Sequence, residues 1–147
     1  MAWQLAGRQL SIGWALALCY HVGFRGKDLT VAVALMTAES GRYTEAWHEN
    51  IAFDPDVFGD AFSTTVDSID RGLFQINSKW HADLSEEDAF KAIPNARYAY
   101  AMSSGMYFSP WMAYTSGAYE KYMLPVWVVR TLGVWKRKLP RVEQELG

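Results

Sequence analysis

The stretch Ser68–Trp80, SIDRGLFQINSKW, is the most informative segment of this 147-residue chain. Near its centre, the apolar Phe74 and Ile76 alternate with the amides Gln75 and Asn77. In an extended segment, alternation of this kind places the two amides on one face and the apolar pair on the other. We therefore expect a strand-like or turn segment whose polar face can line a cleft wall.

The region that leads into this segment, residues 42–69, lacks helical periodicity. Residues 42–69 scatter Gly, Asp, Ser, Thr and Pro55 among aromatic residues, which is a composition typical of loops. We expect a loop region here that can hold a small β-hairpin, with the strand-like segment following over residues 69–77.

Two helices are predicted upstream of the loop region. Residues 8–22 predict a mostly buried helix that ends at a glycine. A second helix follows, with Asp28 or Thr30 as its N-cap. Its residues 29–38 are apolar on nearly every side, so we expect it to be central, and Gly41 is placed to end it in a left-handed conformation.

Helical patterns resume downstream. Ser85 precedes three acidic residues and predicts a helix start. Residues 94–104 predict a longer helix that ends at Gly105, and residues 111–122 a further aromatic-rich helix or turn. Pro125 is expected to open the last segment. The sequence therefore predicts an α+β fold that is mainly α-helical, with a small β element.

Composition indicates one compact domain. The chain is 50% hydrophobic and 15% aromatic, which is enough apolar surface for a core and excludes global disorder. The net charge of −2 argues against a nucleic-acid partner. We also expect no transmembrane segment, because no apolar run has the required length.

Cysteine and histidine usage gives no sign of a metal or cofactor. The single cysteine, Cys19, cannot form an internal disulfide, and its apolar surroundings predict a buried, inert thiol. His21, His48 and His81 are scattered without ligand spacing, and no Gly-rich phosphate loop occurs.

Glu39 is the first candidate for chemistry. It ends an apolar helix beside Ser40 and Gly41. Burial disfavours the charged form of a carboxyl and raises its pKa, and a carboxylic acid that stays protonated near neutral pH can donate a proton to a leaving oxygen. The alternative interpretation is a solvated residue at the point where the helix meets water.

Asp70 is the second candidate. A carboxylate opposite the acid can stabilise the oxocarbenium-like transition state of glycosidic cleavage. The alternatives are a surface aspartate paired with a nearby arginine, or a turn former. Gln75 and Asn77 suit the hydroxyl and N-acetyl groups of a sugar, and Trp80, Trp111 and Tyr114 can stack on sugar rings or simply pack in the core.

Three segments in order resemble the signature of soluble lytic transglycosylases. They are residues 39–41 (ESG), 72–77 (GLFQIN) and 113–117 (AYTSG), and Asn95–Arg97 resembles the helix start that precedes the third motif. The resemblance covers roughly residues 24–122. It implies that Tyr114 lies near Glu39 and that Ser40 orients the substrate.

Residues 68–80 are also similar to the sheet segment of animal-type lysozymes. This resemblance implies a lysozyme-like fold with a cleft between two lobes. It makes Glu39 the acid and Asp70 the nucleophile or charge stabiliser. Substrate contacts would come from Gln75, Asn77 and Trp80.

The implied activity is cleavage of the β-1,4 bond between N-acetylmuramic acid and N-acetylglucosamine in peptidoglycan. The gap between Glu39 and Asp70 is longer than in the animal enzymes, and their disulfides are missing. Hydrolysis and transglycosylation both stay open. Carboxyls about 5–5.5 Å apart would favour a retaining hydrolase, and about 6.5–9.5 Å an inverting one.

The rival hypothesis is a non-catalytic wall-binding or structural module with the same fold.

The motifs, with Asp70–Leu73 and Ser109–Trp111, look most like wall-degrading domains from phages of actinobacteria. Such domains reach the wall through a holin, as endolysins, or act from a virion tail. The apolar run over residues 10–18 is expected to belong to the first helix and not to a signal peptide. The expected location is therefore the host cytoplasm before release, or the virion tail.

Residues 1–123 are predicted to form the catalytic domain and residues 124–147 a C-terminal helical extension. The extension carries five positive and two negative side chains, a charge of +3. It can be a final helix packed on the same domain, with cations near its end. The alternative is a basic helix that binds a membrane surface or a partner.

Overall fold

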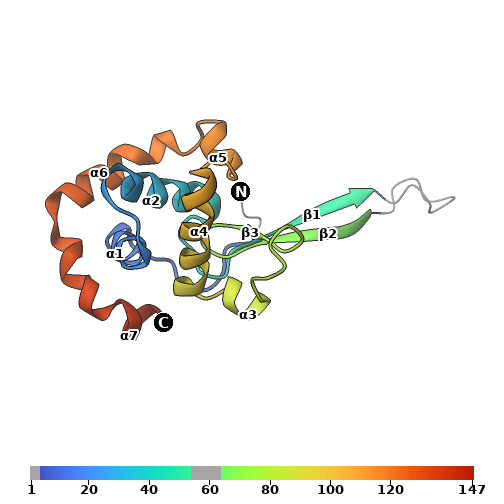
Figure 1. The fold of residues 1–147 in the computed structure, drawn as a ribbon, viewed down its shortest axis with the longest axis horizontal. Coiled ribbons are helices and arrows are strands. Elements are labelled where there is room, and N and C mark those ends of the chain that lie inside the picture. Colours follow the sequence, from blue (N-terminus) through green and yellow to red (C-terminus); the bar gives the residue numbers. More distant parts are fainter. Residues whose placement is uncertain (1–3, 54–63) are drawn as a thin grey trace.

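The computed structural model describes residues 4–53 and 64–147, which form a helical part and a small sheet that extends from it (Figure 1). The longest helices are α1 (Ile12–Val22), α2 (Gly26–Ser40) and α4 (Ala92–Met106). The sheet contains β1 (Trp47–Phe53), β2 (Thr64–Arg71) and β3 (Ile76–Asn77). The predicted α+β class, mainly α-helical with a small β element, is confirmed.

Helix α1 begins at Ile12 and not at residue 8, because the preceding residues are extended. The backbone N–H of Leu10 donates to the carbonyl oxygen of Arg42. The Ser11 side chain then caps the helix by accepting a hydrogen bond from the Trp14 N–H at 3.1 Å. The middle of this helix, from Ala15 to Cys19, is buried on every side, so Cys19 is the buried thiol that its sequence context predicts.

Helix α2 is the central helix, with all residues from Leu29 to Met36 buried. The predicted N-caps were wrong: the helix begins at Gly26, and Arg25, three residues before Asp28, occupies the N-cap without a side-chain hydrogen bond. Asp28 instead lies in the first turn and accepts a hydrogen bond from the Tyr107 hydroxyl. The predicted left-handed end at Gly41 is confirmed by its φ of 61°.

The three strands form an antiparallel sheet in the order β1-β2-β3. Its register places His48 opposite Asp70, and Asp70 opposite Asn77. The loop prediction for residues 42–69 therefore underestimated the sheet, since most of the described part of this region belongs to β1 and β2. The sheet therefore places His48, Asp70 and Asn77 side by side, each on a different strand.

The remaining short elements connect the sheet to the C-terminal segment. They are α3 (Glu86–Ala89), α5 (Met112–Thr115) and η1 (Glu120–Tyr122). The Ser85 side chain caps α3, as expected, by accepting from the N–H of Asp88 at 3.1 Å. The predicted end of α4 at Gly105 was wrong, because the helix continues to Met106 and ends at Tyr107, whose φ is 56°.

A buried asparagine joins the sheet to the helical part. Asn95 accepts from the Phe74 N–H at 3.0 Å, and its amide donates to the carbonyl oxygens of Arg71 and Ala89. This close approach needs a glycine at residue 72, where a Cβ would lie 2.2 Å from the Ala89 oxygen. The segment that precedes the cleft amides is thereby fixed against the start of α4.

The C-terminal segment contains α6 (Met123–Leu132), η2 (Val134–Arg141) and α7 (Val142–Leu146), and it curves around α1 (Figure 1). Helix α6 begins two residues before the predicted start at Pro125. The segment buries four side chains, namely Val126, Trp135, Val142 and Leu146. The domain boundary at residue 123 stays a prediction. Within residues 4–53 and 64–147, none of the helices is long and apolar enough to cross a membrane.

Candidate active site

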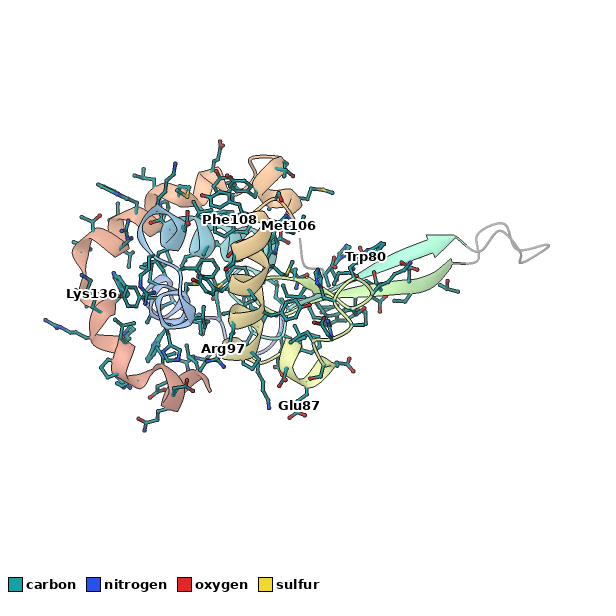
Figure 2. The ribbon with its side chains drawn as sticks, viewed as in Figure 1. Trp80, Glu87, Arg97, Met106, Phe108 and Lys136 are labelled. Carbon is teal, nitrogen blue, oxygen red and sulfur yellow. The ribbon has the colours of Figure 1, made fainter. Side chains whose placement is uncertain are left out.

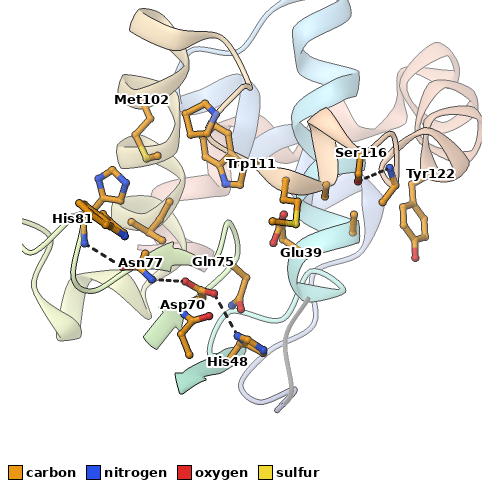
Figure 3. Close-up of a pocket in the computed structure, with 18 of the residues that line it drawn as sticks. Glu39, His48, Asp70, Gln75, Asn77, His81, Met102, Trp111, Ser116 and Tyr122 are labelled. Carbon is orange, nitrogen blue, oxygen red and sulfur yellow. Dashed lines mark hydrogen bonds and ion pairs between the residues drawn. The ribbon is translucent and has the colours of Figure 1, made fainter. Parts of the chain in front are cut away.

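A cleft of about 630 Å³ lies where the end of α2 meets the sheet and the residue 110–122 region. Six of the eight predicted site residues line this cleft. They are Glu39, Asp70, Gln75, Asn77, Trp80 and Trp111. Figure 3 shows Glu39 entering the cleft from α2 and Asp70 entering it from the β2 side. The fold thus brings together residues that are far apart in the sequence.

Glu39 lies in the last turn of α2, and only 8% of the residue is exposed. Burial raises the pKa of its carboxyl above the ordinary value. The negative charge of Asp70 also raises this pKa, whereas a hydrogen bond from the backbone of Ala113 opposes the rise. Removal from water penalises the ionised form, so Glu39 can keep a proton at a pH where an exposed glutamate has lost it.

Asp70 is held by neighbours from both adjacent strands. The Asn77 amide donates to its Oδ1 at 2.9 Å, and His48 Nδ1 lies 3.5 Å from its Oδ2. The alternative interpretation was an aspartate paired with a nearby arginine, and the adjacent Arg71 does not provide this pairing. The Arg71 guanidinium donates instead to the carbonyl oxygens of Ile76, Leu84 and His81.

His48 is a cleft residue that the sequence analysis did not single out. It reaches Asp70 because β1 and β2 pair in a register that places the two residues opposite each other. No local pattern around residue 48 indicates this pairing, since the two residues are joined only through the sheet. The histidine and the aspartate are about three-quarters buried, with side-chain exposures of 22% and 26%.

The two amides have different roles in the cleft. Asn77 is fully engaged: its amide nitrogen donates to Ser68 and Asp70, and its oxygen accepts from the backbone of Lys79 and Trp80. It therefore orients Asp70 and the following turn.

Gln75 leaves an acceptor available. Its φ of 52° turns the chain, and its amide nitrogen donates to the carbonyl oxygens of Ala46 and Gly72. Its Oε1 is buried, and within the part of the chain that the structure describes it has no hydrogen-bond partner. A buried acceptor of this kind is satisfied by a donor from a bound molecule or water.

The two cleft tryptophans differ in exposure. Trp80 is 77% exposed and offers an aromatic face to a ligand. Trp111 is 5% exposed, donates its indole N–H to the Phe74 oxygen at 2.8 Å, and packs against Phe74 and Phe108. Trp111 therefore forms the cleft floor as part of the core.

Ser40 and Tyr114 are not among the residues that line the cleft. The Ser40 hydroxyl is buried, donates to the Met36 oxygen and accepts from the Arg42 N–H, which completes the end of α2. Tyr114 stacks with Tyr119 at a ring distance of 5.0 Å. The structure gives both residues structural contacts beside the cleft.

Comparison with protein families gives one match. The family model described as "Lysozyme like domain" matches residues 16–113, two-thirds of the chain. The chain belongs to the lysozyme-like domain family. The match runs from α1 into α5 and contains Glu39, Asp70 and both cleft amides. Comparisons with curated proteins and with solved structures found no match.

Membership of this family points to a peptidoglycan-degrading enzyme. The cleft suits such a substrate, because it combines a carboxyl of raised pKa, a second carboxylate and an exposed tryptophan. Among residues 4–53 and 64–147, no group of three or more His, Cys, Asp and Glu side chains could hold a metal ion.

Proposed function

We propose that this protein cleaves the β-1,4 bond between N-acetylmuramic acid and N-acetylglucosamine in peptidoglycan. The observation that carries the proposal is the buried Glu39, whose pKa is raised and which shares its cleft with Asp70. Two carboxyls in different surroundings are the arrangement by which glycosidases separate an acid from a charged carboxylate. The family match supports the same substrate.

In the first step, protonated Glu39 donates its proton to the glycosidic oxygen. The bond between this oxygen and C1 of N-acetylmuramic acid breaks, and the electron pair leaves with the protonated oxygen. Positive charge develops at C1 and the ring oxygen. Ionised Asp70, oriented by Asn77 and flanked by His48, stabilises this charge.

In the second step, ionised Glu39 accepts a proton from the nucleophile that attacks C1. If the nucleophile is water, the product is a reducing end, as in a lysozyme. If it is the C6 hydroxyl of the same sugar, a 1,6-anhydro ring closes, as in a lytic transglycosylase. Glu39 regains its proton in both cases, and the chemistry of the product ends distinguishes them.

The test compares wall digestion by the native chain with digestion by Glu39→Gln. The amide keeps the shape of the carboxyl but cannot donate the proton, so we expect the rate to fall by about a thousandfold. Glu87→Gln is the matched control, because Glu87 lies on α3 with a side chain 79% exposed. Equal activity of all three proteins would contradict the assignment, and wall binding without cleavage by the native chain would favour a non-catalytic binding module.

We further propose that the protein is phage-encoded and acts in host lysis or in wall penetration. The support is the resemblance of Asp70–Leu73 and Ser109–Trp111 to wall-degrading domains of actinobacterial phages. On this proposal, the protein waits in the host cytoplasm for release through a holin, or it resides in a virion tail. Purified actinobacterial walls should then be cleared faster than walls of unrelated bacteria, and the reverse order would contradict the proposal.

A further inference from the structure

The outward face of α6 carries a row of large apolar side chains. Leu124, Trp127, Val128 and Leu132 are 68%, 52%, 44% and 71% exposed, and their spacing of three and four residues places them on one side of the helix. Val134 continues the row beyond the helix and is 58% exposed. A surface helix normally carries polar residues at such positions. We call these five residues the apolar row.

The opposite face of the same segment is anchored in the protein, which fixes the orientation of the row. Val126 and Trp135 are 1% and 3% exposed. The Trp135 indole donates to the Arg130 oxygen, and the Arg130 guanidinium reaches the Thr30 hydroxyl at 3.4 Å. The apolar row therefore faces outward as a result of the packing.

A cationic pocket lies beside the row. This hollow of about 350 Å³ is lined by Tyr20, Gly26, Leu29, Arg130, Thr131, Trp135 and Lys136. Its lining contains two cations and no carboxylate. Thr131 connects the two features, since it lines the pocket and its exposed side chain lies one turn after Trp127, whose carbonyl oxygen accepts from its hydroxyl.

We propose that the apolar row and the cationic pocket together bind the surface of a bilayer that contains anionic phospholipids. Large apolar side chains, including a tryptophan, enter the boundary between headgroups and acyl chains, while neighbouring lysines and arginines attract anionic headgroups. Arg130 and Lys136 can receive a lipid phosphate, and Arg137 and Lys138 extend the positive charge along η2. Helix α6 has only 10 residues, and no helix in the described part of the chain is long and apolar enough to span a bilayer, so we place the contact at its surface.

Charge complementarity favours a membrane over a second copy of this chain. A symmetric pair that buried the apolar row would bring two identical clusters of cations together, because a two-fold interface joins the same patch of each copy. An anionic bilayer instead offers opposite charge beside an apolar layer. The proposal is independent of the proposed function, since it uses residues outside the cleft.

Binding at this surface leaves the sheet side of the molecule accessible. In Figure 2, Lys136 lies at one edge of the helical part, whereas Trp80 lies beside the sheet on the opposite side. A bilayer held at the Lys136 side would therefore not cover Trp80. A membrane-attached protein could present its cleft to material outside the bilayer.

The test is flotation of the full chain with vesicles of neutral phosphatidylcholine alone, or mixed in about equal parts with phosphatidylglycerol. We expect flotation with the mixed vesicles only, and less of it at high salt. Trp127→Ser should weaken binding by about tenfold through loss of apolar contact. Lys136→Gln should weaken it by about fivefold through loss of one charge near the surface.

Two matched controls keep the test specific. Trp80→Ser removes a tryptophan that is more exposed than Trp127, and Arg97→Gln removes an exposed cation at the start of α4. Both should float like the native chain, and thermal melts should show that all variants fold. The proposal is overturned if the native chain does not float with anionic vesicles, or if the controls lose as much binding as Trp127→Ser. A dimer that Trp127→Ser abolishes, without vesicle binding, would assign the row to a second copy.

Discussion

At the scale of single residues, the cleft gives its two carboxyls different surroundings. Glu39 is buried at the end of α2 and has a raised pKa, whereas Asp70 accepts a hydrogen bond from Asn77 and lies beside His48. An acid must hold its proton, and a charge stabiliser must be ionised. The burial of Glu39 favours the role of the acid for this residue.

The pH dependence of cleavage should report the Glu39 proton. Activity needs this proton, so kcat/KM should fall as the pH rises through the raised pKa of Glu39. Asp70→Asn removes a charge that raises this pKa, so the alkaline limb should move to lower pH. The same substitution should lower the maximal rate by about a hundredfold, because a transition-state charge loses its partner. An unmoved alkaline limb would contradict the coupling of the two carboxyls.

Burial of Glu39 also predicts a cost in stability. The folded state holds this proton more tightly than the unfolded state, so stability is lost as the pH rises from the ordinary glutamate pKa through the raised pKa. Glu39→Gln should therefore unfold at a higher temperature than the native chain near neutral pH. The difference should shrink as the pH falls toward the ordinary glutamate range. Thermal melts over a pH series measure it, and Glu87→Gln should show no such gain.

Most of the cleft residues could be predicted because they lie in local patterns. Glu39 follows an apolar helix, and Gln75 and Asn77 alternate with buried neighbours. His48 could not be found this way, because only the pairing of β1 with β2 brings it to Asp70. Ser40 shares the same motif as Glu39, yet its hydroxyl is engaged by the helix backbone.

At the scale of elements, we expect substitution by alanine to have opposite effects on stability at Gly72 and at Gly105. Gly72→Ala places a Cβ 2.2 Å from the Ala89 oxygen at a φ of +72°, so we expect a loss of about 3 kcal/mol or more. Gly105→Ala adds a Cβ inside α4 with no atom within 4 Å. It should stabilise the protein by about 0.5–1 kcal/mol. Urea unfolding measures both, and equal effects would contradict the described packing.

The element boundaries show where sequence patterns are sufficient. Gly41 ends α2 as predicted, because a left-handed residue is required there. Gly105 does not end α4, because glycine is tolerated in a helix and Tyr107 takes the positive φ instead. The sheet was underestimated because its strands are stabilised by partners distant in sequence, which local composition does not reveal.

At the scale of the whole molecule, the C-terminal segment packs against α1 through Trp135, whose ring lies 5.7 Å from that of Tyr20. If the segment folds as one unit with the rest, Trp135→Ala should lower the stability of the entire chain by about 3–5 kcal/mol. Calorimetry should then show one transition at a lower temperature. Two separate transitions would instead divide the chain near the predicted boundary at residue 123.

The central claim is glycosidic cleavage with Glu39 as the acid, and mass spectrometry of digested peptidoglycan tests it most directly. The native chain should release disaccharide-containing muropeptides, and Glu39→Gln should release almost none. Products with 1,6-anhydro ends would identify a lytic transglycosylase, and reducing ends a lysozyme. Intact glycan strands after incubation with the native chain, or the same products from Glu39→Gln, would contradict the claim.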